Sequence, residues 1–158
     1  MRSFILSLFM VFTVSAYAQE ERDTLLKRCP IFILDTVTNN NFFIEARPAT
    51  LKVYRVKGDL TVVVEQREQM FTLFFGIKKL KSTKYKISTT PNGKSEIGAK
   101  YSFHAGDQVS YVNVSSGFVE VLFDKEKEVW LIKVNGLIAN YVERTISYYK
   151  VKGDLAIK

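Results

Sequence analysis

Short apolar segments separated by polar turns repeat along the chain from about residue 30 to its end. The segments are rich in Val, Ile, Tyr, Phe and Thr, and the turns recur roughly every ten residues, a spacing typical of antiparallel β structure. This pattern predicts an all-β fold in which an antiparallel meander closes into a sandwich or a barrel. The predicted strands cover residues 31–37, 42–46, 50–57, 60–66, 70–77, 83–89, 97–103, 108–115, 118–124, 128–134 and 137–150.

The predicted turns have sequences that suit reverse turns. Asn39-Asn40-Asn41 tolerates left-handed backbone, Pro91-Asn92-Gly93 favours a reverse turn, and residues 124–128 form a charged hairpin tip. Ahead of the strands, residues 20–28 are the one helical candidate. They show no clear apolar stripe, so we expect a turn or a short helix within a leader segment, residues 19–30.

One strand shows a clean alternation of apolar and polar positions. Trp130, Ile132 and Val134 occupy one face, while Leu131 and Lys133 occupy the other. This predicts that Trp130 packs in the core, with an exposed aromatic on a binding face as the alternative.

The first eighteen residues predict export. An apolar run follows Arg2 and ends in Ser15-Ala16-Tyr17-Ala18, which resembles a signal-peptide cleavage site, so residues 1–18 are predicted to be removed after Ala18. The run is too short for a transmembrane helix, and no later segment supplies one. We therefore expect a secreted or periplasmic protein. Cys29 has no second cysteine to pair with, so it either packs as a small hydrophobe or bonds to another chain.

The remainder divides into residues 31–95 and 96–158, or forms one continuous domain from 31 to 158. A nonapeptide echoes between the two parts, since residues 54–62 read Y-R-V-K-G-D-L-T-V and residues 149–157 read Y-K-V-K-G-D-L-A-I. Lys-Gly-Asp is predicted as a hairpin turn in both copies. Nothing outside the nonapeptide repeats, which favours shared turn chemistry over a duplicated unit.

Two short motifs in the last third resemble the Src-homology-3 family. Residues 101–109 read Y-S-F-H-A-G-D-Q-V, similar to the family's L-S-F-x-x-G-D-x-L, and residues 135–143 read N-G-L-I-A-N-Y-V-E, similar to G-x-I-P-x-N-Y-V. The resemblance covers residues 97–145 and implies a small barrel. Of the family's peptide groove, Tyr141 carries over, Ala139 replaces the proline, and the groove tryptophan maps onto Phe118 or Trp130. Exported bacterial relatives of this fold are often linked to cell-wall binding.

Catalytic chemistry has few candidates in this composition. His104 is the only histidine and Cys29 the only cysteine, which argues against a histidine-based metal site, a zinc cluster or a catalytic triad. A turn at Gly106-Asp107 follows His104, which favours an exposed or capping role for this histidine. A carboxylate pair remains open, with candidates Glu45, Glu65, Glu120 and Asp124, most of them at predicted outward or turn positions. We expect no enzyme activity, no metal and no cofactor.

Binding is therefore the predicted class of function. The net charge of +7 and a lysine cluster around Tyr85 suit a partner of negative charge. The predicted partner is a protein or a cell-envelope polymer, not nucleic acid. The hypothetical contact surface combines basic and aromatic side chains: Lys79, Lys81, Lys84, Tyr85, Tyr111, Phe118 and Tyr141. The alternatives are a periplasmic inhibitor or immunity-type protein, and a barrel that carries a small apolar ligand among its phenylalanines.

Overall fold

The computed structural model describes residues 22–142 and 144–158, and it builds this part of the chain from eleven strands and no helix. The strands are β1 (Arg22–Leu26), β2 (Ile31–Asp35), β3 (Ala49–Val56), β4 (Asp59–Gln66), β5 (Gln69–Phe74), β6 (Thr83–Ile87), β7 (Glu96–Ala105), β8 (Gln108–Asn113), β9 (Ser116–Asp124), β10 (Val129–Val142) and β11 (Thr145–Ile157). The predicted all-β class is confirmed. The predicted signal peptide and its cleavage site lie outside the described residues.

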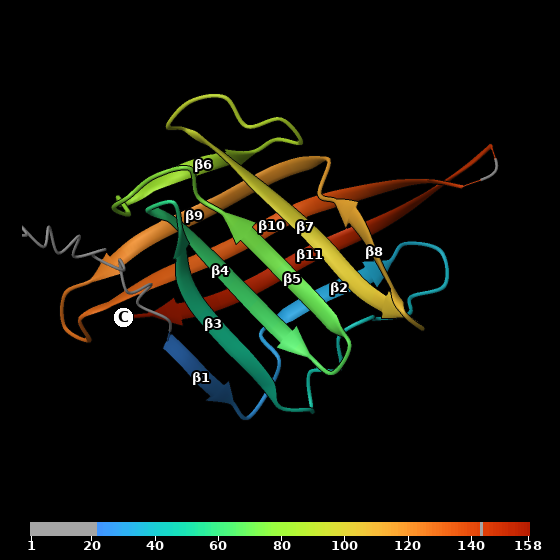
Figure 1. Cartoon of the computed structure of the whole chain (residues 1–158), viewed down its shortest axis with the longest axis horizontal. Coiled ribbons are helices and arrows are strands. Elements are labelled where there is room, and N and C mark those ends of the chain that lie inside the picture. The colour runs from blue at the N-terminus through green and yellow to red at the C-terminus, as the bar shows by residue number, and fades with distance from the viewer. Residues whose placement is uncertain (1–21, 143) are drawn as a thin grey trace, which may run out of the picture.

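All eleven strands belong to one curled sheet that forms a half-barrel. Its order is β1-β3-β4-β5-β7-β6-β9-β10-β11-β2, with β8 attached to β7. The neighbours are antiparallel except β6 and β7, which run parallel over a short stretch. In Figure 1 the strands β3, β4, β5 and β7 cross in front of β9, β10 and β11, so the curled sheet presents two facing halves. Strands from the two predicted regions interleave, because β2 pairs with β11 and β5 pairs with β7.

The core lies between the facing halves and follows the alternation along the strands. On β10, Ile132 and Val134 are buried, while Leu131 and Lys133 are exposed, as the alternation predicts. Trp130 is half-buried against this core, and its ring contacts Phe123 with 4.9 Å between the ring centroids. No helix in the described ranges is long and apolar enough to cross a membrane.

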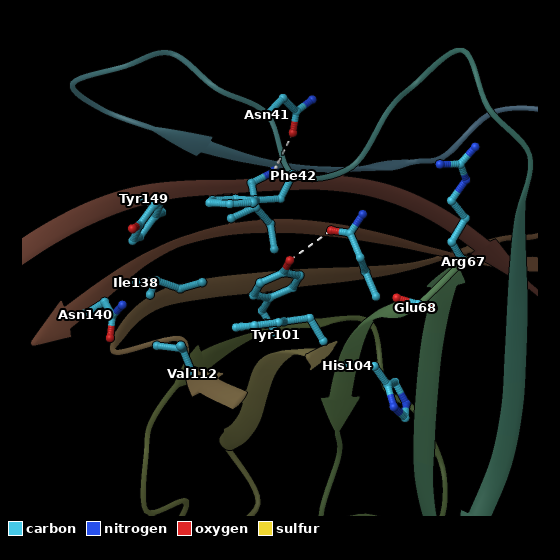
Figure 2. A pocket seen from close by; sticks show the side chains of 13 residues that line it. Asn41, Phe42, Arg67, Glu68, Tyr101, His104, Val112, Ile138, Asn140 and Tyr149 are labelled. Atoms are coloured by element: carbon cyan, nitrogen blue, oxygen red, sulfur yellow. Dashed lines mark hydrogen bonds between the residues drawn. The ribbon is translucent and has the colours of Figure 1, made fainter. Parts of the chain in front are cut away.

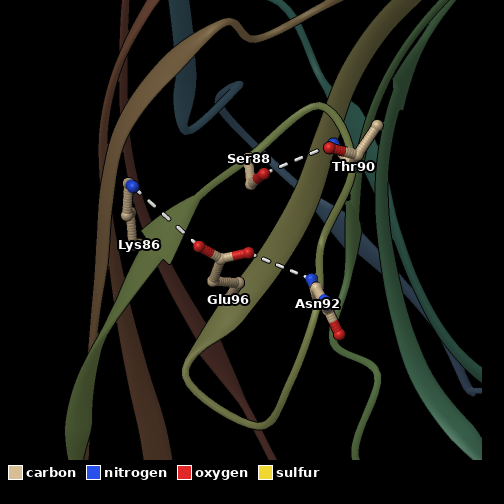
Figure 3. A network of polar contacts seen from close by, with 5 residues as sticks. All are labelled: Lys86, Ser88, Thr90, Asn92 and Glu96. Carbon is tan, nitrogen blue, oxygen red and sulfur yellow. Dashed lines mark hydrogen bonds and ion pairs between the residues drawn. The ribbon is translucent and has the colours of Figure 1, made fainter.

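The loop between β6 and β7 turns over residues 93–96, where the Glu96 N–H donates to the Gly93 carbonyl, and not over Pro91-Asn92-Gly93 as predicted; Gly93 is the one residue that the two have in common. Gly93 adopts a φ of 103°, and the Asn92 N–H donates to Oε2 of Glu96 over 3.0 Å. Oε1 of the same carboxylate lies 3.9 Å from Nζ of Lys86 (Figure 3). Glu96 therefore ties the loop to both strands where β7 begins to run parallel to β6.

The strand predicted over residues 42–46 is wrong. After an isolated bridge at Asn41, the chain forms bends and turns instead, with the Phe43 side chain fully buried. The Gln66 side-chain amide takes the place of a neighbouring strand: Oε1 accepts from the Ile44 N–H at 2.8 Å, and Nε2 donates to the Ile44 carbonyl at 2.8 Å. A single side chain thus satisfies backbone groups that would otherwise require a ladder.

The turn or short helix predicted over residues 20–28 is wrong for its described part. Residues Arg22–Leu26 form β1, which pairs antiparallel with β3. Strand pairing satisfies the backbone here, although most side chains of β1 are exposed and show no clear apolar face.

The second Lys-Gly-Asp is not a turn. The first copy turns as predicted, with positive φ at Lys57 and Gly58 between β3 and β4. The second copy lies inside β11, where a Cβ on Gly153 would come within 2.5 Å of Cδ1 of buried Ile31. Glycine therefore permits a turn in one copy and close packing in the other. The two Lys-Gly-Asp sequences are identical, so the sequence alone does not distinguish these roles.

The strands predicted over 128–134 and 137–150 are also divided wrongly. β10 continues through Gly136, and the chain reverses only after Val142. Gly136 faces Gly117 of β9, and a Cβ on Gly136 would lie 2.7 Å from Cγ1 of Val114, which is fully buried. The Val114 side chain thus fills the space that a side chain at position 136 would need, so glycine keeps the strand continuous.

We predict that Gly117→Ala lowers the free energy of unfolding by about 3 kcal/mol, because it adds backbone strain to a steric overlap. Gly117 has a φ of 131°, and a Cβ there would lie 2.2 Å from the backbone oxygen of Asn135. Gly76→Ala is the control, since a Cβ at that position has no heavy atom within 4 Å. Urea unfolding measures both variants, and equal stabilities would contradict the close approach of β9 and β10.

Candidate functional site

A cleft of about 960 Å³ opens at one end of the half-barrel, between its facing halves. One wall comes from β7 and β8, the opposite wall comes from β10 and β11, and the loop after β2 covers it (Figure 2). The volume of this cleft falls within the size range of small-ligand sites.

Aromatic rings from three separate segments meet in the cleft. The Phe42 ring lies 5.7 Å from the Tyr101 ring and 5.4 Å from the Tyr149 ring, measured between centroids. Phe103 also stacks on Tyr101, with 5.6 Å between the ring centroids. Aromatic pairs at these separations attract one another, and their faces offer flat apolar surface to a ligand.

Hydrogen bonds to backbone groups hold the loop that places Phe42 in the cleft. The Phe42 N–H donates to the Ile33 carbonyl, and the Ile33 N–H donates to Oδ1 of Asn41, both over 3.1 Å. Two residues further on, the Gln66 side chain holds Ile44 through both of its backbone groups. The loop is therefore anchored on both sides of Phe42, while the Phe42 side chain remains 36% exposed.

The floor of the cleft is uncharged at neutral pH. The Tyr101 hydroxyl donates to Oε1 of Gln69 over 2.9 Å. Burial raises the pKa of Tyr101 to about 12, so this hydroxyl keeps its proton under physiological conditions. A protonated hydroxyl and a side-chain amide can orient a polar group of a ligand without placing a charge beneath it.

Charged side chains occupy one side of the rim. Arg67 and Glu68 form the turn between β4 and β5, with a φ of 56° at Arg67. The exposed side chain of His104 lies nearby, and its backbone N–H donates to the Glu68 carbonyl at 2.9 Å (Figure 2). Asn140 of β10 lines the cleft from the side away from Arg67. The cleft thus combines an aromatic floor with a polar rim.

The lining of the cleft offers few of the side chains that commonly act as nucleophiles. The residues that line the cleft include no serine, threonine, cysteine or lysine, and His104 stands among Arg67 and Glu68. Cys29 is buried elsewhere, and burial raises the pKa of its thiol. Within residues 22–142 and 144–158, no group of three His, Cys, Asp or Glu side chains could hold a metal ion.

The four candidate carboxylates lie away from the cleft. Glu65 pairs with Lys52 at 2.9 Å and Glu120 with Lys84 at 3.4 Å. Asp124 accepts two backbone N–H bonds in the β9–β10 turn, which confirms the charged hairpin tip. Glu45 is exposed in the loop before β3.

The prediction that Tyr85 belongs to a contact surface is wrong. Its side chain is 1% exposed, and its ring packs edge-on against Phe75. The Tyr85 hydroxyl bonds to the backbone of Lys81, accepting from its N–H at 3.3 Å. β6 runs between β7 and β9, and its alternation directs Tyr85 inward while the neighbouring lysines, Lys84 and Lys86, point outward.

The other predicted contact residues are exposed or half-buried but fall into two groups. Lys84 places its Nζ 3.5 Å from the centre of the Phe118 ring, and Lys79 and Lys81 are exposed just before β6. The second group is Tyr111 of β8 and Tyr141 near the end of β10, which are 64% and 74% exposed. β6 and β8 lie at opposite ends of the view in Figure 1, so the predicted surface is not continuous.

Sequence reasoning missed the aromatic set of the cleft. The only signal was the alternation of Tyr101 and Phe103, which places both rings on one face of β7. Nothing local indicates that Phe42 and Tyr149 meet them, because these contacts join distant segments.

We predict that Tyr101→Phe makes the fall in stability at alkaline pH shallower. The unfolded chain loses the tyrosine proton near pH 10, whereas the folded protein holds it to a pKa of about 12. The corresponding stability is complete below about pH 10 and is lost as the pH rises from about 10 to 12. Urea unfolding at a series of pH values measures the effect; identical slopes for variant and parent would contradict the buried hydroxyl.

Comparison of the chain with protein-family models, with curated proteins and with solved structures gives no match. The resemblance to Src-homology-3 domains therefore stays a prediction. Its two motifs run along β7 into β8 and along β10.

Proposed function

We propose that this protein is a non-catalytic binding protein whose half-barrel cleft holds the apolar part of a ligand. The observation that carries the proposal is the aromatic floor, where Phe42, Tyr101, Phe103 and Tyr149 surround a cleft of about 960 Å³. Such a cleft offers a ligand several ring faces at once, and burial of apolar surface is the dominant favourable term in binding.

The polar groups around the floor suit orientation of a ligand. Gln69 and Asn140 present amide groups on different walls, and each amide can both donate and accept. A ligand with an apolar body and one or two polar groups would satisfy both the floor and the rim. This favours a binding role of the kind expected for a barrel that encloses an apolar ligand.

Support for binding over catalysis comes from the lining of the cleft. A nucleophile needs a base within hydrogen-bond reach, and the lining supplies no serine, threonine or cysteine beside His104. The Tyr101 hydroxyl, with its raised pKa, is a poor base and a poor nucleophile at neutral pH. If the chain is exported as its sequence predicts, the ligand would be one that occurs in the periplasm or outside the cell.

We predict that Val112→Asp weakens the binding of an apolar dye, Nile red, by at least about tenfold. Val112 lines the cleft, and a carboxylate there must lose hydration when an apolar molecule covers it. Val109→Asp is the matched control, because Val109 lies on the same strand but is 55% exposed and outside the cleft. Fluorescence titration of Nile red gives the dissociation constants.

The two variants separate the cleft from the rest of the surface. If both variants lost the same affinity for Nile red, or neither lost any, the dye would bind outside the cleft and the proposal would be contradicted. Circular dichroism and thermal unfolding of each variant confirm that the fold is retained.

A further inference from the structure

Beside the cleft, the last residues of β10 have no neighbouring strand on one edge. β9 pairs with β10 as far as Ser116 opposite Leu137, and the chain before it leads back to β8. The last bonds on this edge are made by Ser115, whose N–H and hydroxyl both donate to the Leu137 carbonyl over 2.8 Å. From Ile138 to Val142, β10 pairs with β11 alone.

The alternation of the backbone identifies which groups face this open edge. The Leu137 carbonyl points toward β9, so the N–H and C=O groups of Ala139 and Tyr141 point the same way. Tyr148, which stands opposite Ala139, turns its carbonyl to Thr36 on the far side and not to β10. Among the described residues, no hydrogen bond reaches the outward groups of Ala139 and Tyr141.

β8 forms the other border of the same opening. It pairs with β7 on one side only, and it approaches β10 near the point where the chain crosses to β9. Val112 of β8 and Ile138 of β10 both line the cleft. On the outer faces of the same strands, Tyr111 and Tyr141 are exposed. The cleft therefore lies between β8 and the free edge of β10.

This opening lacks the protection that the other exposed edges carry. Natural sheet edges are shielded by charges, by proline or by a covering loop. β1 carries Arg22 and Asp23, and the outer edge of β2 is covered by its own loop through bonds such as Phe42 N–H to the Ile33 carbonyl. By contrast, neither residues 137–142 nor residues 108–113 contain a charge or a proline.

We infer that an extended segment of a partner protein adds as a strand to the free edge of β10, with every second side chain entering the cleft. The inference rests on the proposed binding function of that cleft and names its ligand class. Repeated donors and acceptors at Ala139 and Tyr141 match another peptide backbone, which a compact apolar molecule cannot supply. Alternate apolar side chains then reach the floor at the period of a strand.

The test uses a fluorescein-labelled peptide of about seven residues in which valine alternates with threonine. Glutamate at each end suits the +7 net charge of the protein. Fluorescence anisotropy measures its affinity for the protein and for two variants. Ala139→Pro removes an outward N–H that has no partner in the described chain, and Ala139→Val retains it. A peptide methylated on alternate backbone nitrogens is the matched ligand control.

We expect Ala139→Pro to weaken peptide binding by about tenfold, Ala139→Val to leave it within about twofold, and methylation to abolish it. Nile red affinity should be unchanged in both variants. Amide hydrogen exchange on the unmodified protein gives an independent readout, with slower exchange at Ala139 and Tyr141 when the peptide is bound.

Each other outcome overturns the inference. Equal binding of both peptides, or unchanged exchange at Ala139 and Tyr141, would exclude strand addition while Nile red binding kept the proposed function intact. If Nile red did not bind to the unmodified protein, the proposed function itself would be contradicted. Dimerisation of the protein in gel filtration that Ala139→Pro abolishes would identify the occupant as a second copy of this chain.

Discussion

The close approach of β9 and β10 at Gly117 and Gly136 is the constraint on which the open end of the half-barrel depends. A Cβ on Gly117 would overlap the backbone of β10, and Val114 fills the space above Gly136. Val114 lies in the short link between β8 and β9, and its burial fixes the place where the chain passes from one strand to the other. β10 and β11 then continue past this point without β9 beside them. The wall of the cleft and the free edge of β10 both result from this crossing.

The aromatic set stabilises the two halves against each other where the sheet is open. Phe42 contacts rings from β7 and β11, and the loop that carries it is bonded to β2 and to Gln66 of β4. Without those rings the facing halves would leave an unfilled apolar gap, which costs dispersion contacts on both sides. Part of the gap remains open as the cleft, so the packing that completes the fold also shapes the candidate site.

Local pattern was sufficient for much of the fold and for little of the site. Alternation at Trp130, Ile132 and Val134 and turn chemistry at Lys57-Gly58 depend on adjacent residues, so the sequence predicts them correctly. The conformation of the second Lys-Gly-Asp depends on packing against Ile31 of a neighbouring strand, so its sequence alone predicts a turn that does not form. Tyr85 likewise stands among lysines in sequence, yet its strand lies between two neighbours and buries it. The cleft joins rings from distant segments, and no local signal reports that.

We propose that this protein binds its ligand in the aromatic cleft and not on the lysine-bearing surface around Lys84. The most direct measurement is a nuclear magnetic resonance titration of the isotopically labelled protein with Nile red, followed through backbone amide shifts. We expect the shifts to concentrate on residues that line the cleft, such as Tyr101, Val112, Asn140 and Tyr149. Shifts centred on Lys84 and Phe118, or no shifts at saturating dye, would contradict it.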